Sequence, residues 1–218
     1  MNIQNKKILF LGDSITEGFG PQDIENVYWK RLERSCGCVS VGFGISGTRI
    51  ARQQKPSPDP REDQYFRSRV AAMDENADVV VVFGGTNDYG HGDAPLGGPE
   101  DRTENTFWGA CHVLFARLQE RFPNATIVVL TPLHRTNEEN ERGDSSKPVP
   151  SGTLETYVEI LRAVAKRFDL PMLDLFEKSA ADTRIPGVVE KYIPDGLHPN
   201  DAGHVVLADE IEAFLRNL

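Results

Sequence analysis

Four short segments of the chain contain residue types that act together in acyl transfer. The first has a serine directly after an apolar run, and the last has an aspartate three residues before a histidine. The two segments between them combine glycines with polar side chains. The segments are Gly12–Thr16, Gly44–Thr48, Gly84–Asp88 and Asp195–Pro199. A hydroxyl nucleophile, an imidazole base and a carboxylate that orients the base are the groups that attack a carbonyl carbon.

Ser14 follows the first apolar run, where a strand is expected to turn into a helix. Its hydroxyl would lie at the edge of the sheet, beside N–H groups that a helix start leaves without partners. Asp195 is near enough to His198 to accept its Nδ1–H, which would leave Nε2 facing a serine. Structural explanations remain open, because Ser14 could cap the helix and the Asp195–His198 pair could lie on the surface.

Gly47 and Asn87 are candidate donors to a developing negative charge. Gly47 would let the backbone approach a bound group and offer its N–H, and Asn87 could turn its amide into the site. A turn glycine and an Asx turn are the alternatives. The segment Gly42–Gly47 also matches the glycine pattern of dinucleotide-binding folds. That pattern requires an acidic residue at a strand end about 20 positions later, where this chain is polar and has no strand.

The elements that must position these residues alternate along the chain. Five short apolar runs predict strands buried on both faces of a parallel sheet. Alternation of strands and helices predicts a three-layer α/β/α sandwich around a five-stranded parallel sheet, as one domain over residues 1–218. Active sites of such sheets lie at the carboxyl ends of the strands. The expected strands are Ile8–Leu11, Val39–Phe43, Val79–Phe83, Thr126–Leu130 and Met172–Leu175.

Helical spacing of apolar residues predicts two helices, over 107–122 and 154–168, and a third after Pro199. Asp101 and Glu104 could form a capping box at the first of them. Weaker patterns suggest helices over 27–34 and 62–73. The apolar face expected for the last helix comprises Val205, Ala208, Ile211 and Leu215. Two long loops remain, Tyr89–Arg102 and Leu133–Pro150, which are either functional or solvated insertions.

Charge and composition exclude several classes of function. A net charge of −9 over 218 residues repels nucleic acids and anionic membranes. No run reaches the roughly 18 apolar residues of a membrane span, and the polar start does not resemble a signal peptide, so a cytoplasmic location is expected. The three cysteines, Cys36, Cys38 and Cys111, suit neither a disulfide framework nor a metal site.

Taken in order, the four segments resemble the four blocks of the SGNH/GDSL hydrolase family. Gly-Asp-Ser ends at Ser14, Ser-Gly-Thr is centred on Gly47, Gly-Thr-Asn-Asp contains Asn87, and Asp-x-x-His ends at His198. Ile15 replaces the leucine of the family's name motif, which is a conservative change. The resemblance implies a flavodoxin-like sandwich and needs no cofactor or metal.

The resemblance also implies roles for individual residues. Ser14 would be the nucleophile, His198 the base and Asp195 its partner. The N–H groups of Ser14 and Gly47, with the Asn87 side chain, would form the oxyanion hole. No G-x-S-x-G nucleophile elbow occurs, which excludes the α/β-hydrolase assignment. Few paired histidines and aspartates are present, which disfavours a metallophosphoesterase.

The expected activity is hydrolysis of a small-molecule carboxylic ester. The absence of a long apolar lid favours short acyl groups, for example acetyl on a sugar. A thioesterase, a lysophospholipase and a catalytically silent binding module of the same fold are the alternatives. The sequence makes no prediction of oligomeric state. Candidate substrate contacts are Asp13, Tyr89, His91 and His134, with Phe19 and Tyr28 as possible walls.

Overall fold

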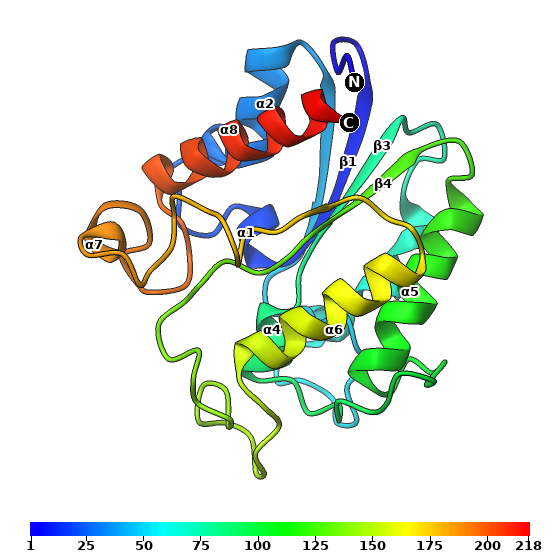
Figure 1. The fold of residues 1–218 in the computed structure, drawn as a ribbon, viewed down its shortest axis with the longest axis vertical. Helices are drawn as coiled ribbons and strands as arrows, with labels where there is room; N and C mark the ends of the chain where they lie inside the picture. Colours follow the sequence, from blue (N-terminus) through cyan, green and yellow to red (C-terminus); the bar gives the residue numbers. More distant parts are fainter.

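In the computed structural model, which describes residues 1–218, five parallel strands form one central sheet in the order β2-β1-β3-β4-β5 (Figure 1). The expected three-layer sandwich with a five-stranded parallel sheet is confirmed. β5 is shorter than predicted, because the chain turns after Leu173. The strands are β1 (Lys7–Gly12), β2 (Val39–Gly44), β3 (Val79–Phe83), β4 (Thr126–Leu130) and β5 (Met172–Leu173).

Successive side chains of each strand point to opposite faces of the sheet, which gives the molecule two apolar cores. In β1, Ile8 and Phe10 enter one core, and Leu9 and Leu11 enter the other. All five residues of β3 are buried, as expected for a strand covered on both faces.

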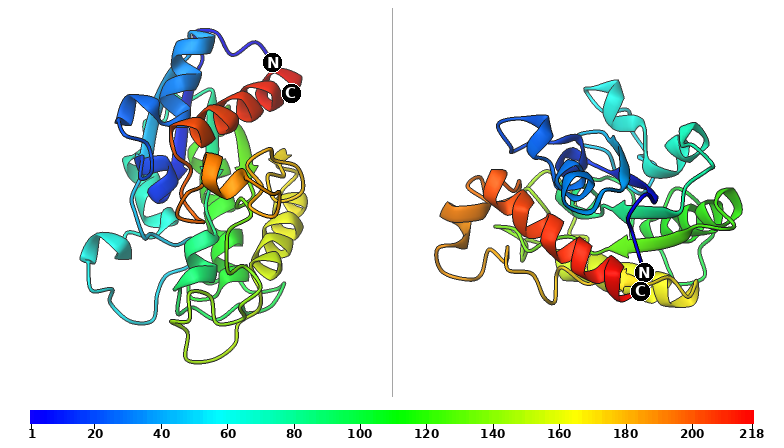
Figure 2. Two further views of the ribbon diagram at one scale, coloured as in Figure 1. Left: turned by 90° about the vertical axis from the view of Figure 1, so that its left-hand side faces the viewer. Right: turned by 90° about the horizontal axis from the view of Figure 1, so that it is seen from above.

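Helices cover both faces of the sheet. Figure 1 shows α2 (Tyr28–Cys36) and α8 (Asp201–Asn217) on one side, and α5 (Phe107–Arg121) and α6 (Leu154–Arg167) on the other. In both views of Figure 2, α8 lies beside α2, so the first long helix and the last pack together. The shorter helices are α1 (Ser14–Glu17), α3 (Phe66–Arg69), α4 (Thr86–Gly90) and α7 (Val188–Tyr192). No helix is both long enough and apolar enough to cross a bilayer.

The structure differs from two helix predictions, the start of α5 and the helix over 62–73. α5 begins at Phe107 with Thr106 as its cap, whose hydroxyl accepts the N–H of Gly109 at 3.2 Å. Asp101 instead accepts the Thr106 hydroxyl, and Glu104 accepts the Tyr65 hydroxyl, so the expected capping box is wrong. The helix expected over 62–73 is broken into 3₁₀ turns at 60–63 and 70–72 around the single turn of α3.

The buried face of α8 also differs from the expected one. Val205 is 38% exposed, whereas His204 and Leu207 are fully buried next to Ile211 and Leu215. The apolar stripe is therefore rotated by one position at its start, because the imidazole of His204 fills a place in the core.

Connections between the strands bring four chain segments to one edge of the sheet. The chain passes from β1 to β2 on one side of β1, then returns to β3 on its other side. This reversal leaves a crevice beyond the carboxyl ends of β1 and β3, where open α/β sheets bind their ligands. Ser14, Gly47 and Asn87 follow β1, β2 and β3 at this edge.

The two sides of α8 should respond differently to truncation. Ile211→Ala, at a side chain only 1% exposed, should lower the free energy of unfolding by about 2–5 kcal/mol, because it leaves a cavity. Val205→Ala, at 38% exposure, should change it by less than about 0.5 kcal/mol. Denaturant unfolding followed by circular dichroism measures both, and equal losses would contradict the observed packing of α8.

Candidate active site

The turn after β1 leaves the Ser14 hydroxyl free. Asp13 is the cap of α1, and its carboxylate accepts the N–H of Ile15 at 3.1 Å. Ser14 is therefore the first residue of the helix and does not have the capping role that its position allowed. A side chain on Gly12 would meet Thr16 at 1.9 Å, so this glycine permits the abrupt change from strand to helix.

The structure places His198 and Asp195 in a row with Ser14. Ser14 Oγ lies 3.0 Å from His198 Nε2, and His198 Nδ1 lies 2.7 Å from Asp195 Oδ2. The other oxygen of Asp195 accepts the N–H groups of Leu197 at 2.9 Å and His198 at 2.7 Å. The carboxylate is thus fixed by the loop that also carries the imidazole.

The Asp195 carboxylate keeps its negative charge in this position. Burial tends to raise the pKa of Asp195, but hydrogen bonds from the backbone and ring of His198 and from Leu197 outweigh it and hold the pKa below its ordinary value. A charged carboxylate next to Nδ1 favours the tautomer with its proton there, which leaves Nε2 able to accept the hydroxyl proton of Ser14.

Two close contacts hold the His198 loop in place, the first against the turn that carries Ser14 and the second against the 133–150 loop. Gly20 lies so near Pro199 that an added Cβ would be 2.2 Å from its carbonyl oxygen. On the other side, the Thr136 N–H donates to the carbonyl of Gly196 at 2.9 Å. The Phe19 ring lies 4.5 Å from the His198 ring, centroid to centroid, so Phe19 covers the imidazole as a wall residue.

Gly47 presents an N–H group that has no protein acceptor. Its φ of +73° is in the left-handed region that favours glycine, and its carbonyl accepts the guanidinium of Arg49 at 2.8 Å. His91 Nε2 lies 3.3 Å from the same carbonyl. The orientation of this loop is thus determined by contacts on the carbonyl side of Gly47, and the N–H remains available to a ligand.

Asn87 is buried, and its amide donates to the carbonyl of Thr48 at 3.1 Å. This bond uses one of the two N–H groups of the amide. It also joins the segment after β3 to the loop that contains Gly47. The structure therefore brings together Ser14, Gly47, Asn87, Asp195 and His198, all of the residues predicted for the triad and the oxyanion hole.

A buried arginine that the sequence analysis did not identify lies beneath this edge of the sheet. The Arg69 guanidinium donates to the carbonyl of Gly12 at 3.0 Å, the hydroxyl of Thr48 at 3.1 Å and the carbonyl of Phe43 at 2.5 Å. It thereby joins the ends of β1 and β2 to the Gly47 loop. Burial lowers the pKa of Arg69 to about 10, so it is charged at neutral pH.

Two buried carboxyl groups interact with each other at this edge of the sheet, and the first of them also interacts with Arg69. Burial raises the pKa of Asp13 to about 7, although the Ile15 N–H and the charge of Arg69 oppose it. Burial likewise raises the pKa of Asp88 to about 6, against hydrogen bonds from the N–H groups of Ala51 and Ile50, both at 2.9 Å. Both side chains bind backbone groups of the framework. Asp13 is therefore a cap through one of its oxygens, and its contact with a substrate stays a prediction.

The structure argues against two of the expected substrate contacts. Tyr89 is fully buried, and its hydroxyl donates to the backbone carbonyls of Asn137 and Asn140. Both ring nitrogens of His134 are occupied, one by Glu138 at 2.8 Å and the other by the Phe176 carbonyl at 2.7 Å. In both cases the polar atoms of the side chain are already used within the protein. Their partners belong to the 133–150 loop, except for the carbonyl of Phe176.

Tyr28 is also part of the framework, because its buried hydroxyl lies 2.9 Å from that of Thr16. Of the histidines proposed for substrate contact, only His91 lies next to the candidate site. The structure contains no group of His, Cys, Asp and Glu side chains suited to a metal ion.

Comparison with protein-family models identifies the GDSL-like lipase/acylhydrolase family, whose model matches residues 10–206. The chain belongs to this family. The GDSL-like family consists of hydrolases, so at family level the chain is a hydrolase of the esterase and lipase type. Comparison with curated proteins gave no match.

Solved structures share the fold over the whole chain. A protein from Lactobacillus plantarum is 29% identical, with a TM-score of 0.83, 99% of this chain and 98% of that chain being covered. A carbohydrate acetylesterase family member from Sinorhizobium meliloti is 17% identical, with a TM-score of 0.66 and 97% and 98% coverage. An acetyl xylan esterase is 20% identical, with a TM-score of 0.61 and 95% and 98% coverage. At this low identity, the last two show the fold alone.

The backbone of Gly47 gives a direct test of the geometry in this GDSL-like hydrolase. Gly47→Ala should lower the free energy of unfolding by about 1–2 kcal/mol, because of the left-handed backbone. In addition, its methyl group would lie 2.6 Å from Glu62. The matched control Gly98→Ala, which has no atom within 4 Å of the added carbon, should change it by less than about 0.5 kcal/mol. Thermal and denaturant unfolding compare the two variants, and equal stability would contradict the strained position of Gly47.

Proposed function

We propose that the chain hydrolyses carboxylic esters, with Ser14 as nucleophile, His198 as general base and Asp195 as the carboxylate that orients it. The observation that carries this proposal is the row of two hydrogen bonds, 3.0 Å from Ser14 to His198 and 2.7 Å from His198 to Asp195. Family membership supports the reaction class. A silent binding module would need no such row.

The reaction begins when His198 Nε2 takes the hydroxyl proton as Ser14 Oγ attacks the ester carbonyl carbon. The carbonyl π electrons move to the oxygen, which becomes negative. When they return, the bond to the alcohol oxygen breaks, and the imidazolium of His198 donates its proton to that oxygen. Water then attacks the acyl-enzyme by the same steps, which releases the acid and restores Ser14.

The negative oxygen would be stabilised by donors fixed in advance. The N–H of Gly47 has no protein acceptor, and the N–H of Ser14 lies at the first position of α1, where the helix provides no partner. The Asn87 amide adds a third donor. Donors held in place by the protein need no reorganisation during the reaction, which is why they contribute strongly to catalysis.

We propose a short acyl group, such as acetyl on a carbohydrate, as the preferred substrate. Four surface cavities with partly apolar linings lie away from the site and include neither Ser14 nor His198. A long acyl chain would need an apolar cavity beside the nucleophile. The resemblance in fold to a carbohydrate acetylesterase family member and to an acetyl xylan esterase supports the same choice.

Removing the nucleophile should lower kcat much more than removing one oxyanion donor. Ser14→Ala should lower kcat for 4-nitrophenyl acetate by on the order of 10⁶-fold, as in other serine hydrolases that lose the nucleophile. Asn87→Ala should lower kcat by about 10² to 10³-fold, because the other donors remain.

Ser68→Ala and Asn105→Ala, at exposed positions, are the matched controls and should keep full activity. A thermal unfolding curve for each variant separates lost chemistry from lost structure. Unchanged turnover in folded Ser14→Ala would exclude the mechanism.

Hydrolysis should also weaken in acid. A protonated imidazole cannot accept the Ser14 proton, and histidines ordinarily change charge between about pH 8 and about pH 5, so kcat/KM should fall across this range as the pH is lowered. The lowered pKa of Asp195 keeps its carboxylate charged throughout. Asp13 and Asp88, with pKa values of about 7 and about 6, also change charge in this range, so the profiles of Asp13→Asn and Asp88→Asn separate their contribution from that of His198. A pH–rate profile with a stable, uncharged ester measures this, and a flat profile would exclude His198 as the base.

A further inference from the structure

The chain forms a closed loop immediately after the Gly47 segment. This 49–66 loop leaves the sheet edge at Arg49 and returns at Phe66, whose N–H donates to the Arg49 carbonyl at 3.0 Å. In the left view of Figure 2 it is the cyan segment that projects from the rest of the molecule. Compact loops whose ends meet in this way frequently have a function.

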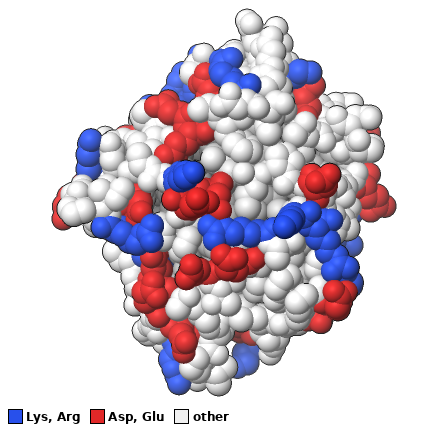
Figure 3. All heavy atoms as spheres, in the orientation of Figure 1, with Lys and Arg blue, Asp and Glu red and all other residues white.

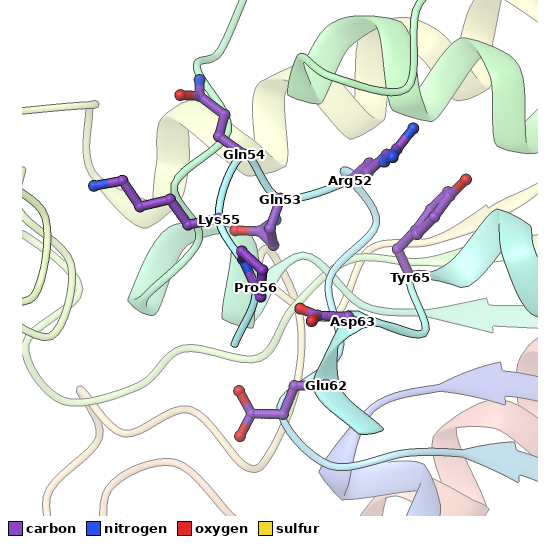
Figure 4. A pocket seen from close by; sticks show the side chains of 8 residues that line it. All are labelled: Arg52, Gln53, Gln54, Lys55, Pro56, Glu62, Asp63 and Tyr65. Carbon is purple, nitrogen blue, oxygen red and sulfur yellow. The ribbon is translucent and has the colours of Figure 1, made fainter. Parts of the chain in front are cut away.

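A cavity of about 530 Å³ lies between the two arms of this loop (Figure 4). One arm contributes residues 52–56, and the other contributes Glu62, Asp63 and Tyr65. Tyr65 and Pro56 are the two residues with largely apolar side chains among the eight that line it, and the other six are polar or charged. A lining of this kind does not suit an acyl chain and suits a polar group with hydrogen-bond acceptors.

The cavity shares a wall with the candidate oxyanion hole. The Glu62 side chain lies against Gly47, since a Cβ added to Gly47 would be 2.6 Å from the Glu62 carboxyl carbon. The buried guanidinium of Arg49 connects the two, because it donates to the Gly47 carbonyl at 2.8 Å and to Glu62 at 3.2 Å. A molecule bound next to Gly47 therefore has the cavity within its reach.

The two carboxylates of the cavity share one cation within the protein. Arg49 pairs with Glu62 at 3.2 Å and with Asp63 at 3.6 Å. Asp63 also accepts the N–H of Ser57 through both oxygens, at 3.0 and 3.1 Å. These contacts hold both carboxylates in place, and Arg49 offsets one of their two negative charges.

The positive charges of the cavity are not neutralised. The Arg52 guanidinium and the Lys55 ammonium form no ion pair and no side-chain hydrogen bond. Most lysines and arginines of this acidic chain are paired, and on the face drawn in Figure 3 basic and acidic side chains lie next to one another. Two free cations beside one cavity are thus a local exception to the charge of the molecule.

The backbone beneath these cations is fixed in position. Both oxygens of Asp93 accept N–H groups from this arm, that of Gln54 at 2.7 Å and that of Lys55 at 3.0 Å. The Arg52 N–H donates to the carbonyl of Glu104 at 2.8 Å. The wall is therefore formed before a ligand arrives, which lowers the entropy lost on binding.

We propose that this cavity binds a negatively charged group, a carboxylate or a phosphate, on the alcohol part of the ester. This inference rests on the proposed function. Arg52 and Lys55 extend from opposite ends of the 52–56 arm (Figure 4), so one of them provides a charge-assisted hydrogen bond to the anion and the other adds a longer-range attraction. The acyl part remains next to Ser14, while the acidic group of the alcohol lies beyond Glu62, at the 52–56 arm of the cavity.

Three acetate esters test the proposal. The first is an O-acetyl ester of glucuronic acid, and the second is the same ester of glucuronamide, whose neutral amide replaces the carboxylate. The third, O-acetyl glucose 6-phosphate, distinguishes phosphate from carboxylate. We expect kcat/KM for at least one acidic ester to exceed that of the amide by about tenfold at low salt. Added salt should reduce this ratio, because the site is open to solvent.

Variants locate the effect in the cavity. Arg52→Gln combined with Lys55→Gln should bring the ratio close to one, and Lys55→Glu should invert it. Lys166→Gln removes a positive charge from an exposed position of α6, outside the cavity, and should leave the ratio unchanged. A ratio of one in the unmodified protein, with hydrolysis that depends on Ser14, would overturn this inference and leave the esterase proposal standing.

A binding measurement keeps the two proposals separable. If no ester is hydrolysed in a manner that depends on Ser14, the proposed function fails, but the cavity can still be judged with free glucuronate and glucose 6-phosphate. Line broadening of either ligand in NMR spectra, lost in the Arg52→Gln/Lys55→Gln variant, supports the anion site. An absence of broadening for both ligands with the unmodified protein would overturn it.

Discussion

The loop that carries His198 must lie directly against the turn that carries Ser14, and the distances at the site depend on this contact. The two residues are separated by almost the whole chain, so packing of α8 on α2 has to bring them together. Gly20 allows the final approach, since any side chain there would collide with the Pro199 carbonyl. The hydrogen bond of 3.0 Å between Ser14 and His198 is a consequence of this packing.

Tyr28 connects the helices that take part. Its backbone N–H donates to His204 on α8 at 3.1 Å, and its hydroxyl lies 2.9 Å from that of Thr16, two residues after the candidate nucleophile. Burial lowers the pKa of His204 to about 3, so its ring is neutral and can accept this hydrogen bond at physiological pH. One buried aromatic residue thus joins the base-bearing end of the chain to the nucleophile-bearing turn.

Arg49 and Arg69 give the Gly47 loop its fixed shape. Such buried charges are unfavourable unless backbone and side-chain acceptors surround them. Here Arg69 binds the ends of two strands, and Arg49 binds the Gly47 carbonyl together with Glu62. Each of these hydrogen bonds takes the place of a hydrogen bond to water that the loop would make if it were flexible. The result is a loop whose free N–H groups point in a determined direction before any ligand binds.

Local patterns in the sequence predicted the features that neighbouring residues determine, namely the strands and the motifs at their ends. Each apolar run lies within a strand or overlaps one, because a strand covered on both faces needs continuous apolar residues. The order of the four motifs placed Ser14, Gly47 and Asn87 correctly at the strand ends. The roles of Arg69 and Tyr28 depend on partners as distant in the chain as Gly12 and His204, and the role of Arg49 depends on the closure of the 49–66 loop. An arginine or tyrosine in a single sequence gives no sign of such partners.

The same reasoning explains the errors at Tyr89 and His134. Both were assigned to the substrate because they follow strand ends, but a loop that folds against the sheet presents backbone groups that need hydrogen-bond partners. The Tyr89 hydroxyl supplies them for the carbonyls of Asn137 and Asn140. Whether a polar loop is solvated or packed is decided by tertiary structure, so the 133–150 loop could be located from its sequence but not described.

The packing of the 133–150 loop argues against its movement as a lid. Lys147 is buried, and its ammonium donates to the Asp88 carbonyl at 2.7 Å, the Ser151 hydroxyl at 3.0 Å and the Tyr157 hydroxyl at 2.6 Å. Lifting the loop would break these bonds and expose the groups that make them. The loop also holds the base in place, through the bond from Thr136 to Gly196, so its opening would disturb the triad itself.

The 49–66 loop differs from the 133–150 loop because only some of its charged side chains are bound within the protein. Arg49 points inward and fixes the loop to the Gly47 segment, whereas Arg52 and Lys55 stand at the cavity with no partner in the protein. Buried pairs support a structure only when both members are present, while unpaired exposed cations contribute little to stability and remain available to a ligand. In the proposed recognition, Arg52 and Lys55 bind the substrate, whereas Arg49 of the same loop and the 133–150 loop support the site. Changes at Arg52 and Lys55 can therefore alter specificity without loosening that support.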